Sequence, residues 1–299
     1  MNQNPRSRFD VLATISRLFV YPVKSCAAVE LQETVLTETG LDLDRAWMVV
    51  DTQGEFVSQR ELPRLALIRP QLKVHEVVLR APGMLALHLQ IDKVEKATQA
   101  KVWDDVVKAF DMGDLAAQWF SDFLAPGIAS GQPLPFRLVR FDPEQRRLSS
   151  LKWTAGIEAP NQFADGFPLL VTSAASLDGL NRRLQAQGQD PVTMERFRPN
   201  IVLSGIEEHD EDRIDTLHIA TDDGAVVLRP VKPCARCPIP NIDPRTAESS
   251  PEVGDTLQSY RQDARVGGAI TFGMNAILVE GDGQMLKVGQ AVQGNYQFG

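Results

Sequence analysis

The sequence predicts an α+β fold that is rich in β-structure and contains a few helices. Short strand-like segments bounded by turn residues recur along most of the 299 residues, whereas apolar residues at helical spacing occupy few segments. Many short strands with few helices favour barrels or barrel-like sheets. A chain of this length, 43% of it hydrophobic, can bury one large core or two medium ones.

The first third of the chain is expected to form antiparallel strands joined by tight turns. Asp51-Thr52-Gln53-Gly54 places a glycine at the last position of a turn, and Ala81-Pro82-Gly83 separates the two strands of a second hairpin. The strands predicted in this region span residues 15–21, 29–37, 46–51, 55–58, 77–80 and 84–89.

An amphipathic helix is predicted over residues 111–123, because apolar side chains recur there at helical spacing. Pro126 and Gly127 should end it. Residues 125–135 are rich in Pro, Gly and Ser, so they are a candidate linker. This divides the chain into an N-terminal domain at 10–130 and a second domain at 131–299. The apolar helix residues are Met112, Leu115, Ala116, Trp119, Phe120 and Phe123.

The second domain is expected to contain one helix and further short strands. Ser173 can cap a helix that ends at Gly188. Leu177, Leu180 and Leu184 lie on one face of it. A hairpin turn at 221–224 leads through Arg229-Pro230 towards two cysteines. The strands predicted here span 201–204, 269–272, 276–280 and 285–288.

Composition excludes several classes of function. With 39 acidic and 31 basic residues the chain carries a net charge of −8 and has no basic tract, so nucleic-acid binding is not expected. Its first eight residues lack the apolar core of a signal peptide, and no apolar run approaches the roughly 18 residues of a membrane span. Three cysteines are too few for a disulfide framework. We therefore expect a cytoplasmic protein without a membrane partner.

The cysteine loop is the segment most suggestive of chemistry. Cys234 and Cys237 lie close together beside Lys232 and Arg236, whose charges favour thiolate over thiol. A dithiol redox motif places its thiolate at a helix N-terminus, but Pro238 sterically disfavours helical backbone at the residue before it, Cys237. An extended loop that presents one sulfur suits a metal or cofactor ligand better. Cys26, in contrast, is expected to be a small core residue, and Cys234 can be the same.

Hydrogen-bond donors occur beside several predicted strands. Lys24 and Ser25 follow one strand, Arg45 precedes another, and Arg198 and Asn200 precede a third. These are the donors that a buried phosphate needs. Solvated charges at strand ends are the alternative for each residue alone. That alternative suits Arg198 least, because an aromatic residue and a proline flank it.

Signatures of other chemistry are absent from the sequence. There is no Gly-rich Walker loop, dinucleotide fingerprint or serine hydrolase elbow. The four histidines lack metal-ligand spacing, and a single cysteine pair is short of the ligands for tetrahedral zinc.

Taken together, these segments resemble the MOSC superfamily, the molybdenum-cofactor sulfurase C-terminal domain proteins. The branch with the mitochondrial amidoxime-reducing component and its bacterial homologues is the most similar. The resemblance covers nearly the whole chain and implies an N-terminal MOSC-associated β-barrel domain followed by a MOSC β-barrel domain with a few helices. The matching segments are Tyr21-Pro22-Val23-Lys24-Ser25, Leu43-Asp44-Arg45-Ala46-Trp47, Arg196-Phe197-Arg198-Pro199-Asn200-Ile201-Val202, Cys234-Ala235-Arg236-Cys237, Ser259-Tyr260-Arg261 and Phe272-Gly273-Met274-Asn275.

The resemblance implies a molybdenum cofactor (Mo-molybdopterin) with Cys237 as the thiolate ligand of the metal, since soft sulfur suits molybdenum. Cys237 and Asp243 would be the catalytic residues, with Asp243 as a carboxylate near the metal or the substrate. The cofactor-binding positions that it implies are Lys24, Ser25, Arg45, Thr172, Ser173, Arg198, Asn200 and Arg236.

The implied activity is the two-electron reduction of N-hydroxylated compounds: amidoximes, hydroxylamines and N-hydroxylated bases. Some relatives carry an iron–sulfur domain, but no cysteine follows Cys237 here. Electrons are therefore expected from a separate ferredoxin-, flavodoxin- or cytochrome b5-like protein. Residues 238–241 differ from the loop of the eukaryotic reductases, which leaves the substrate open.

Two other functions compete with this one. The chain could carry the molybdenum cofactor, or a persulfide on Cys237, without catalysis of its own. A pyridoxal-dependent sulfurase would then have to act in trans, because the sequence has no such domain. A dithiol–disulfide protein is the third alternative, which the prolines around the cysteines disfavour.

Overall fold

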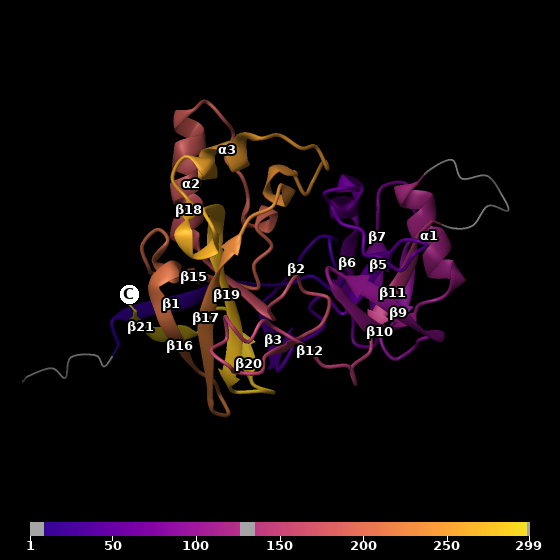
Figure 1. Ribbon diagram of the computed structural model, residues 1–299, viewed down its shortest axis with the longest axis horizontal. Helices are drawn as coiled ribbons and strands as arrows, with labels where there is room; N and C mark the ends of the chain where they lie inside the picture. The colour runs from indigo at the N-terminus through magenta and orange to yellow at the C-terminus, as the bar shows by residue number, and fades with distance from the viewer. Residues whose placement is uncertain (1–8, 126–134, 298–299) are drawn as a thin grey trace, which may run out of the picture.

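The computed structural model describes residues 9–125 and 135–297, which form two lobes (Figure 1). One lobe is built on a closed seven-stranded β-barrel, and the other holds two smaller sheets. The described part of the chain has three α-helices: α1 (Asp114–Leu124), α2 (Ala174–Ala186) and α3 (Glu252–Gln258). None of them is long and apolar enough to cross a membrane. The predicted β-rich α+β fold is confirmed.

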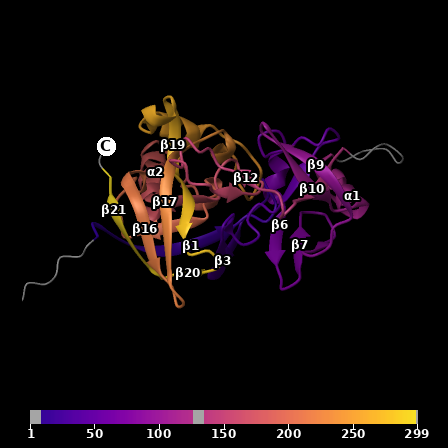
Figure 2. The same cartoon turned by 60° about the horizontal axis from the view of Figure 1, so that its bottom comes forward.

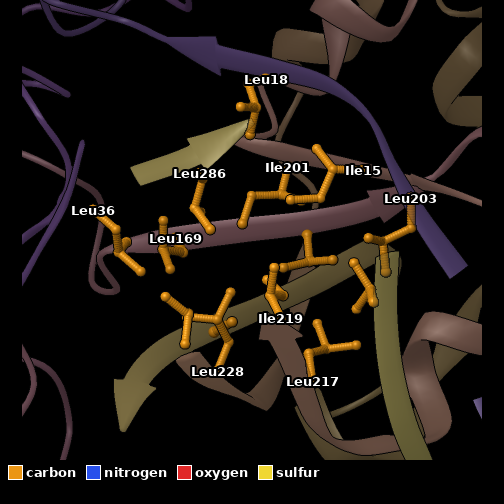
Figure 3. Packing of buried hydrophobic residues seen from close by; sticks show 14 of the residues in the cluster. Ile15, Leu18, Leu36, Leu169, Ile201, Leu203, Leu217, Ile219, Leu228 and Leu286 are labelled. Carbon is orange, nitrogen blue, oxygen red and sulfur yellow. The ribbon is translucent and has the colours of Figure 1, made fainter. Parts of the chain in front are cut away.

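The barrel strands follow the order β14, β15, β1, β21, β16, β17 and β19, and β14 also pairs with β19, which closes the ring. Apolar side chains such as Ile15, Leu203 and Leu228 point towards one another inside it (Figure 3). A small barrel filled in this way is a packed core rather than a channel. The strands are β1 (Val11–Val20), β14 (Leu169–Ser173), β15 (Ile201–Ser204), β16 (Ile214–Ala220), β17 (Ala225–Ala235), β19 (Ala269–Glu280) and β21 (Ala291–Tyr296).

The N-terminal segment of the chain is part of this barrel. β1 lies between β15 and β21, with Val11 opposite Gly294. The indigo strand β3 likewise lies beside the yellow strand β20 (Figure 2). The barrel therefore uses strands from both sides of residue 130, and the predicted domain boundary there stays a prediction. The short strands around the barrel are β2 (Val29–Leu31), β3 (Glu33–Thr37), β4 (Gly40–Leu41), β12 (Arg147–Leu148), β13 (Pro160–Asn161), β18 (Gln262–Asp263) and β20 (Met285–Lys287).

The other lobe packs α1 against its sheets through the aromatic face that the sequence predicts. The helix begins three residues later than predicted, because Asp111 belongs to β10 and its carboxylate accepts a hydrogen bond from Gly113 N at 2.7 Å. The predicted helix end at Pro126-Gly127, and nearly all of the linker at 125–135, lie outside the described residues. The strands of this lobe are β5 (Trp47–Val50), β6 (Arg69–Leu72), β7 (Glu76–Arg80), β8 (Leu87–Gln90), β9 (Lys96–Val102), β10 (Asp105–Asp111) and β11 (Arg137–Phe141).

Some strand bounds differ from the prediction. The predicted strand 29–37 breaks at Gln32, because β2 pairs with β1 whereas β3 pairs with β20. The predicted strands 269–272 and 276–280 form one strand, β19. The strands of four or more residues that were not predicted are β6, β9, β10, β11, β14 and β21, and helix α3 was not predicted either. The predicted hairpin turn at 221–224 does join β16 to β17. Strand β9 (KATQAKV) shows the reason, since it is exposed along most of its length and lacks a long apolar alternation.

Gly273 lies in β19 at the point where the pairing with β14 ends: residues 274–276 pair with both β14 and β17, whereas Thr271 pairs with β17. Its φ is +77°, and an added Cβ would lie 2.6 Å from Thr172 Cγ2 and 2.7 Å from Val171 O. The register of β17 on β19 also shifts between Pro233 and Ala235, next to the cysteine loop. Such bulges bend a strand and redirect its side chains. The missing side chain of Gly273 therefore lets the barrel close beside the cysteines.

We expect Gly273→Ala to lower the free energy of unfolding by about 2–5 kcal/mol. The left-handed conformation costs ~1–2 kcal/mol for a residue with a Cβ, and overpacking against β14 adds ~1–3 kcal/mol. Denaturant unfolding measures the loss. In the control Gly283→Ala, φ is +80° but no atom lies within 4 Å of the new Cβ, so only the conformational cost remains. Equal losses in the two variants would contradict the role of the close approach.

Helix α2 is capped by Ser173 as predicted, because Ser173 Oγ accepts a hydrogen bond from Ser176 N at 3.1 Å. Ser176 Oγ lies 2.8 Å and 2.9 Å from the two carboxyl oxygens of Glu211, which belongs to the 3₁₀-turn η3 (Asp210–Arg213). Glu211 is only 1% exposed. Burial, helped by the neighbouring Asp212 charge, raises the pKa of the Glu211 carboxyl to about 7.

This pKa makes the stability of the protein depend on pH. Between pH 4.5 and 7, folded Glu211 holds a proton that the unfolded chain releases, so its contribution to stability falls as pH rises. The shift is worth about 3 kcal/mol. Burial lowers the pKa of His209 to about 3, which acts in the opposite direction but equally in wild type and a Glu211 variant.

We therefore expect wild type to lose about 3 kcal/mol of stability relative to Glu211→Gln between pH 4.5 and 7. Denaturant unfolding of both proteins at a series of pH values measures this difference. A difference that stays constant across the range would show that Glu211 titrates normally.

Candidate functional site

A cavity opens where one end of the barrel meets the other lobe. Residues of both lobes line it. Seven of the ten site residues predicted from the sequence lie in its wall. They are Lys24, Ser25, Arg45, Arg198, Asn200, Arg236 and Cys237.

These residues come together because the ends of several strands meet at the cavity. Lys24 and Ser25 follow β1, and Arg45 lies two residues before β5. Arg198 lies between the 3₁₀-turn η2 (Met194–Arg196) and β15, and Cys237 follows the end of β17. Residues distant in sequence thus occupy one wall, which sequence spacing alone does not reveal.

Strained backbone is concentrated at the cavity. Ser25, Arg45, Trp103 and Arg198 line it with φ of 67°, 53°, 56° and 59°. They are four of the eight non-glycine residues with positive φ in the described part of the chain. Such residues cost free energy unless the surrounding structure fixes them, and they cluster at functional sites. The strain therefore supports a functional role for this cavity.

Two guanidinium groups of the cavity wall pack on one buried aromatic ring behind it. Arg45 lies 4.2 Å and Arg198 4.3 Å from the ring centre of Tyr21, which is fully buried. Arg45 Nη2 donates to Arg198 O at 3.0 Å, and Arg198 Nη1 donates to Cys26 O at 2.7 Å. Arg198 Nη2 is buried and has no hydrogen-bond partner within residues 9–125 and 135–297. Burial also lowers the pKa of Arg198. A buried donor of this kind favours a ligand that offers a hydrogen-bond acceptor, and an anion would also meet the charge of the guanidinium.

Arg236 is held close to the cysteines. Its Nη1 donates to Cys234 Sγ at 2.9 Å and its Nη2 to Phe197 O at 2.6 Å. Its Nε is buried without a hydrogen-bond partner among the residues that the structure describes. The cavity wall therefore contains a second guanidinium with a buried, unpaired donor.

Asn200 serves to hold strands together. Its Oδ1 accepts from Leu170 N at 3.1 Å, and its Nδ2 donates to Phe19 O at 3.2 Å. Both ends of the amide thus bind backbone of neighbouring barrel strands. Asn200 lines the cavity, but these bonds position the strand end that carries Arg198.

Lys24 is buried beneath the cavity. Its ammonium donates to Phe163 O at 2.7 Å and to Asp165 Oδ1 at 2.5 Å. Burial lowers the pKa of Lys24, and the charge of Asp165 acts against that shift. Trp103 Nε1 also donates to Asp165 Oδ1, at 3.2 Å. The loop that carries Asp165 is fixed by Arg147, which donates to three backbone oxygens in residues 162–165.

The cysteine loop has the form that the prolines predict. Cys237 lies two residues beyond the end of β17 and precedes Pro238, and a short 3₁₀-turn, η4 (Ile239–Asn241), follows. Cys234 and Cys237 are half-buried, free thiols that both line the cavity. Cys26 is fully buried, as expected of a core residue.

Three predicted site residues lie outside the cavity wall. Thr172 is buried, with its hydroxyl 3.4 Å from Met194 Sδ, and Ser173 caps α2. Asp243 accepts from Arg196 Nη2 at 3.2 Å and from Arg245 N at 2.7 Å. Their roles in cofactor binding and catalysis stay predictions.

Other residues of the cavity wall were not predicted from the sequence, among them Phe56, Arg60, Trp103 and Asp165. No motif marks them. The strand pattern around Trp103 was missed, and the strained turn that carries it cannot be inferred from residue types.

The cavity wall is rich in positive charge. Five cationic side chains line it in a protein of net charge −8: Lys24, Arg45, Arg60, Arg198 and Arg236. The cavity therefore favours an anionic ligand that also meets a thiol.

No three His, Cys, Asp or Glu side chains of the described residues are grouped so as to hold a metal ion. The groups present are instead a thiol, cations and unpartnered buried donors. These groups fit a phosphorylated organic cofactor that brings a thiophilic metal with it.

Comparison with known proteins identifies the family. The model of the MOSC N-terminal beta barrel domain matches residues 12–126, and that of the MOSC domain matches residues 158–293. The chain is 34% identical to mitochondrial amidoxime reducing component 2 of Rattus norvegicus over 269 residues, which is 86% of this chain and 75% of the relative. The chain belongs to the MOSC superfamily.

Other MOSC relatives span two named activities. Mitochondrial amidoxime-reducing component 1 of Homo sapiens is 34% identical over 260 residues, covering 84% of this chain and 73% of the relative. The molybdenum cofactor sulfurase of Danio rerio is 30% identical over 279 residues, covering 87% of this chain but 31% of the relative. This MOSC chain is thus similar to the reductase components over most of their length and to a part of the sulfurase.

Proposed function

We propose that this MOSC protein is a molybdenum-cofactor oxidoreductase that reduces N-hydroxylated compounds with electrons from a separate redox protein. The observation that carries the proposal is the cation-lined cavity with Cys237 in its wall. The similarity to amidoxime-reducing components over 86% of the chain supports the same activity.

The cavity residues fit the molybdenum cofactor. Arg45, Arg198 and Arg236 would bind its phosphate and pterin, because guanidinium groups grip oxyanions with two donors at once. Cys237 would bind the metal through its thiolate. When bound, the cofactor supplies the two-electron chemistry, which the protein alone lacks.

The remaining residues of the site would orient and sequester the reactants. Lys24 is locked between Phe163 O and Asp165, so it can present a fixed positive charge to the cofactor without moving. Ser25 is 5% exposed and lies at the same strand end. Electrons would come from a ferredoxin-, flavodoxin- or cytochrome b5-like partner.

The test is to purify the protein from a host that makes molybdopterin and to assay it with an amidoxime and an artificial electron donor. We expect near-stoichiometric molybdenum and formation of the amidine. Protein that holds no molybdenum or pterin although the cofactor is available would contradict the proposal, and so would loaded protein without turnover.

A second candidate is a cofactor or persulfide carrier, which the similarity to a molybdenum cofactor sulfurase supports. Cys237 would then bear the persulfide and transfer it to a partner. Mass spectrometry would find the added sulfur on Cys237 in protein free of molybdenum if this function is correct.

A further inference from the structure

Trp103 occupies a position where a large side chain is unusual. It is the first residue of a two-residue turn, because Val102 of β9 pairs directly with Asp105 of β10. Its φ is 56°. A two-residue hairpin turn with positive φ at its first residue ordinarily carries glycine there, since a bulky side chain is strained. Folding of the hairpin therefore does not explain the tryptophan.

The indole of Trp103 lies in the cavity wall beside a second aromatic ring, tilted 57° to it, and a guanidinium group. The Phe56 ring lies 5.0 Å from it, centre to centre, and the Arg60 guanidinium lies 4.7 Å from the indole centre. All three residues line the cavity. We call this group the aromatic shelf. The indole N–H donates to Asp165 at 3.2 Å, and Asp165 in turn binds Lys24. The orientation of the ring is thus tied to the buried part of the site.

The shelf is available to a ligand. Trp103 remains 41% exposed although it lines the cavity, so a substantial part of its ring is not covered by the protein. The shelf comes from the lobe opposite the cysteine loop, and it faces the same cavity as Cys237. A molecule that fills the cavity can thus contact both the shelf and Cys237.

Building on the proposed function, we propose that Trp103 is a specificity-determining residue of this cavity. The aromatic shelf would bind the planar, conjugated part of an N-hydroxylated substrate and would favour it over a non-planar one. Indole and guanidinium faces stack on flat π-systems, and stacking of this kind is worth roughly tenfold in binding. A puckered, saturated ring of similar size cannot approach either face as closely.

Two probes test this directly: benzamidoxime and cyclohexanecarboxamidoxime, which share the reacting group but differ in the planarity of the ring. Their dissociation constants and kcat/KM values are measured on the loaded wild type, Trp103→Gly and Trp103→Phe. Glycine fits the turn without strain, so this variant removes the ring and keeps the hairpin. Trp153→Ala is the control, because Trp153 is a partly exposed tryptophan outside the cavity wall.

We expect wild type and Trp153→Ala to prefer the planar probe roughly tenfold, Trp103→Gly to lose that preference, and Trp103→Phe to keep part of it. The pterin content should stay unchanged in all four proteins. An unchanged preference in Trp103→Gly, an equal loss for both probes, or a loss of pterin would overturn the proposal, as would a wild type that binds neither probe. Selective binding without turnover would instead support the shelf and contradict only the proposed function.

Discussion

Cys237→Ala is expected to lose most of its molybdenum and all measurable reduction of amidoximes. Cys237 is a free, half-buried thiol in the wall of a cavity lined by cations, where a thiolate can ligate a thiophilic metal. Loss of an outer-shell partner costs a metal site roughly 10–100-fold in affinity or activity, and loss of a direct ligand should cost more. Elemental analysis and a reductase assay on freshly purified protein measure the two effects.

Two other cysteines serve as matched controls. Cys234→Ser keeps a small polar group beside Arg236, whose Nη1 lies 2.9 Å from Cys234 Sγ, so a milder loss is expected. Cys26 is fully buried and burial raises the pKa of its thiol to about 12, so Cys26→Ala should retain molybdenum. Equal loss of activity in the Cys234 and Cys237 variants would favour a dithiol mechanism over a single metal ligand.

Local sequence patterns were sufficient to predict helices whose caps and apolar repeats lie within a few residues of one another. Ser173 caps α2 because serine at that position satisfies a free backbone donor, and the aromatic residues of α1 repeat at the helical period. Strand β9 has no comparable signal, because its polar residues are exposed and its apolar ones are few. The pairing of β1 with β21 joins the two ends of the chain and is a property of the whole fold.

The site likewise contains residues that a sequence motif marks and residues that only the folded structure brings into place. The motif residues Lys24, Arg45, Arg198 and Cys237 were placed in one site by family resemblance, and the structure brings them to one cavity. Trp103 could not be found in this way, because its importance comes from a strained turn and from contacts across the cavity. Thr172 and Ser173 were included on the same resemblance. Both are buried and Ser173 caps a helix, and their role in binding a cofactor stays a prediction.

Arg198→Gln is expected to weaken retention of the pterin by roughly 10- to 100-fold, which is the usual effect of losing hydrogen bonds to a charged group. Arg198 Nη2 is a buried donor without a partner among the described residues, so a phosphate would gain its full charge-assisted bond there. Pterin released from purified protein measures the effect, and thermal unfolding checks that the variant is folded.

Two further variants serve as controls for this prediction. Arg198→Lys keeps the charge but lacks the forked donors, so it should restore little of the lost pterin binding. The control Arg182→Gln removes a guanidinium that is 66% exposed, pairs with Glu208 and does not line the cavity. This variant should retain the pterin fully. Pterin content that is normal in both Arg198 variants would show that the cofactor is held without this guanidinium.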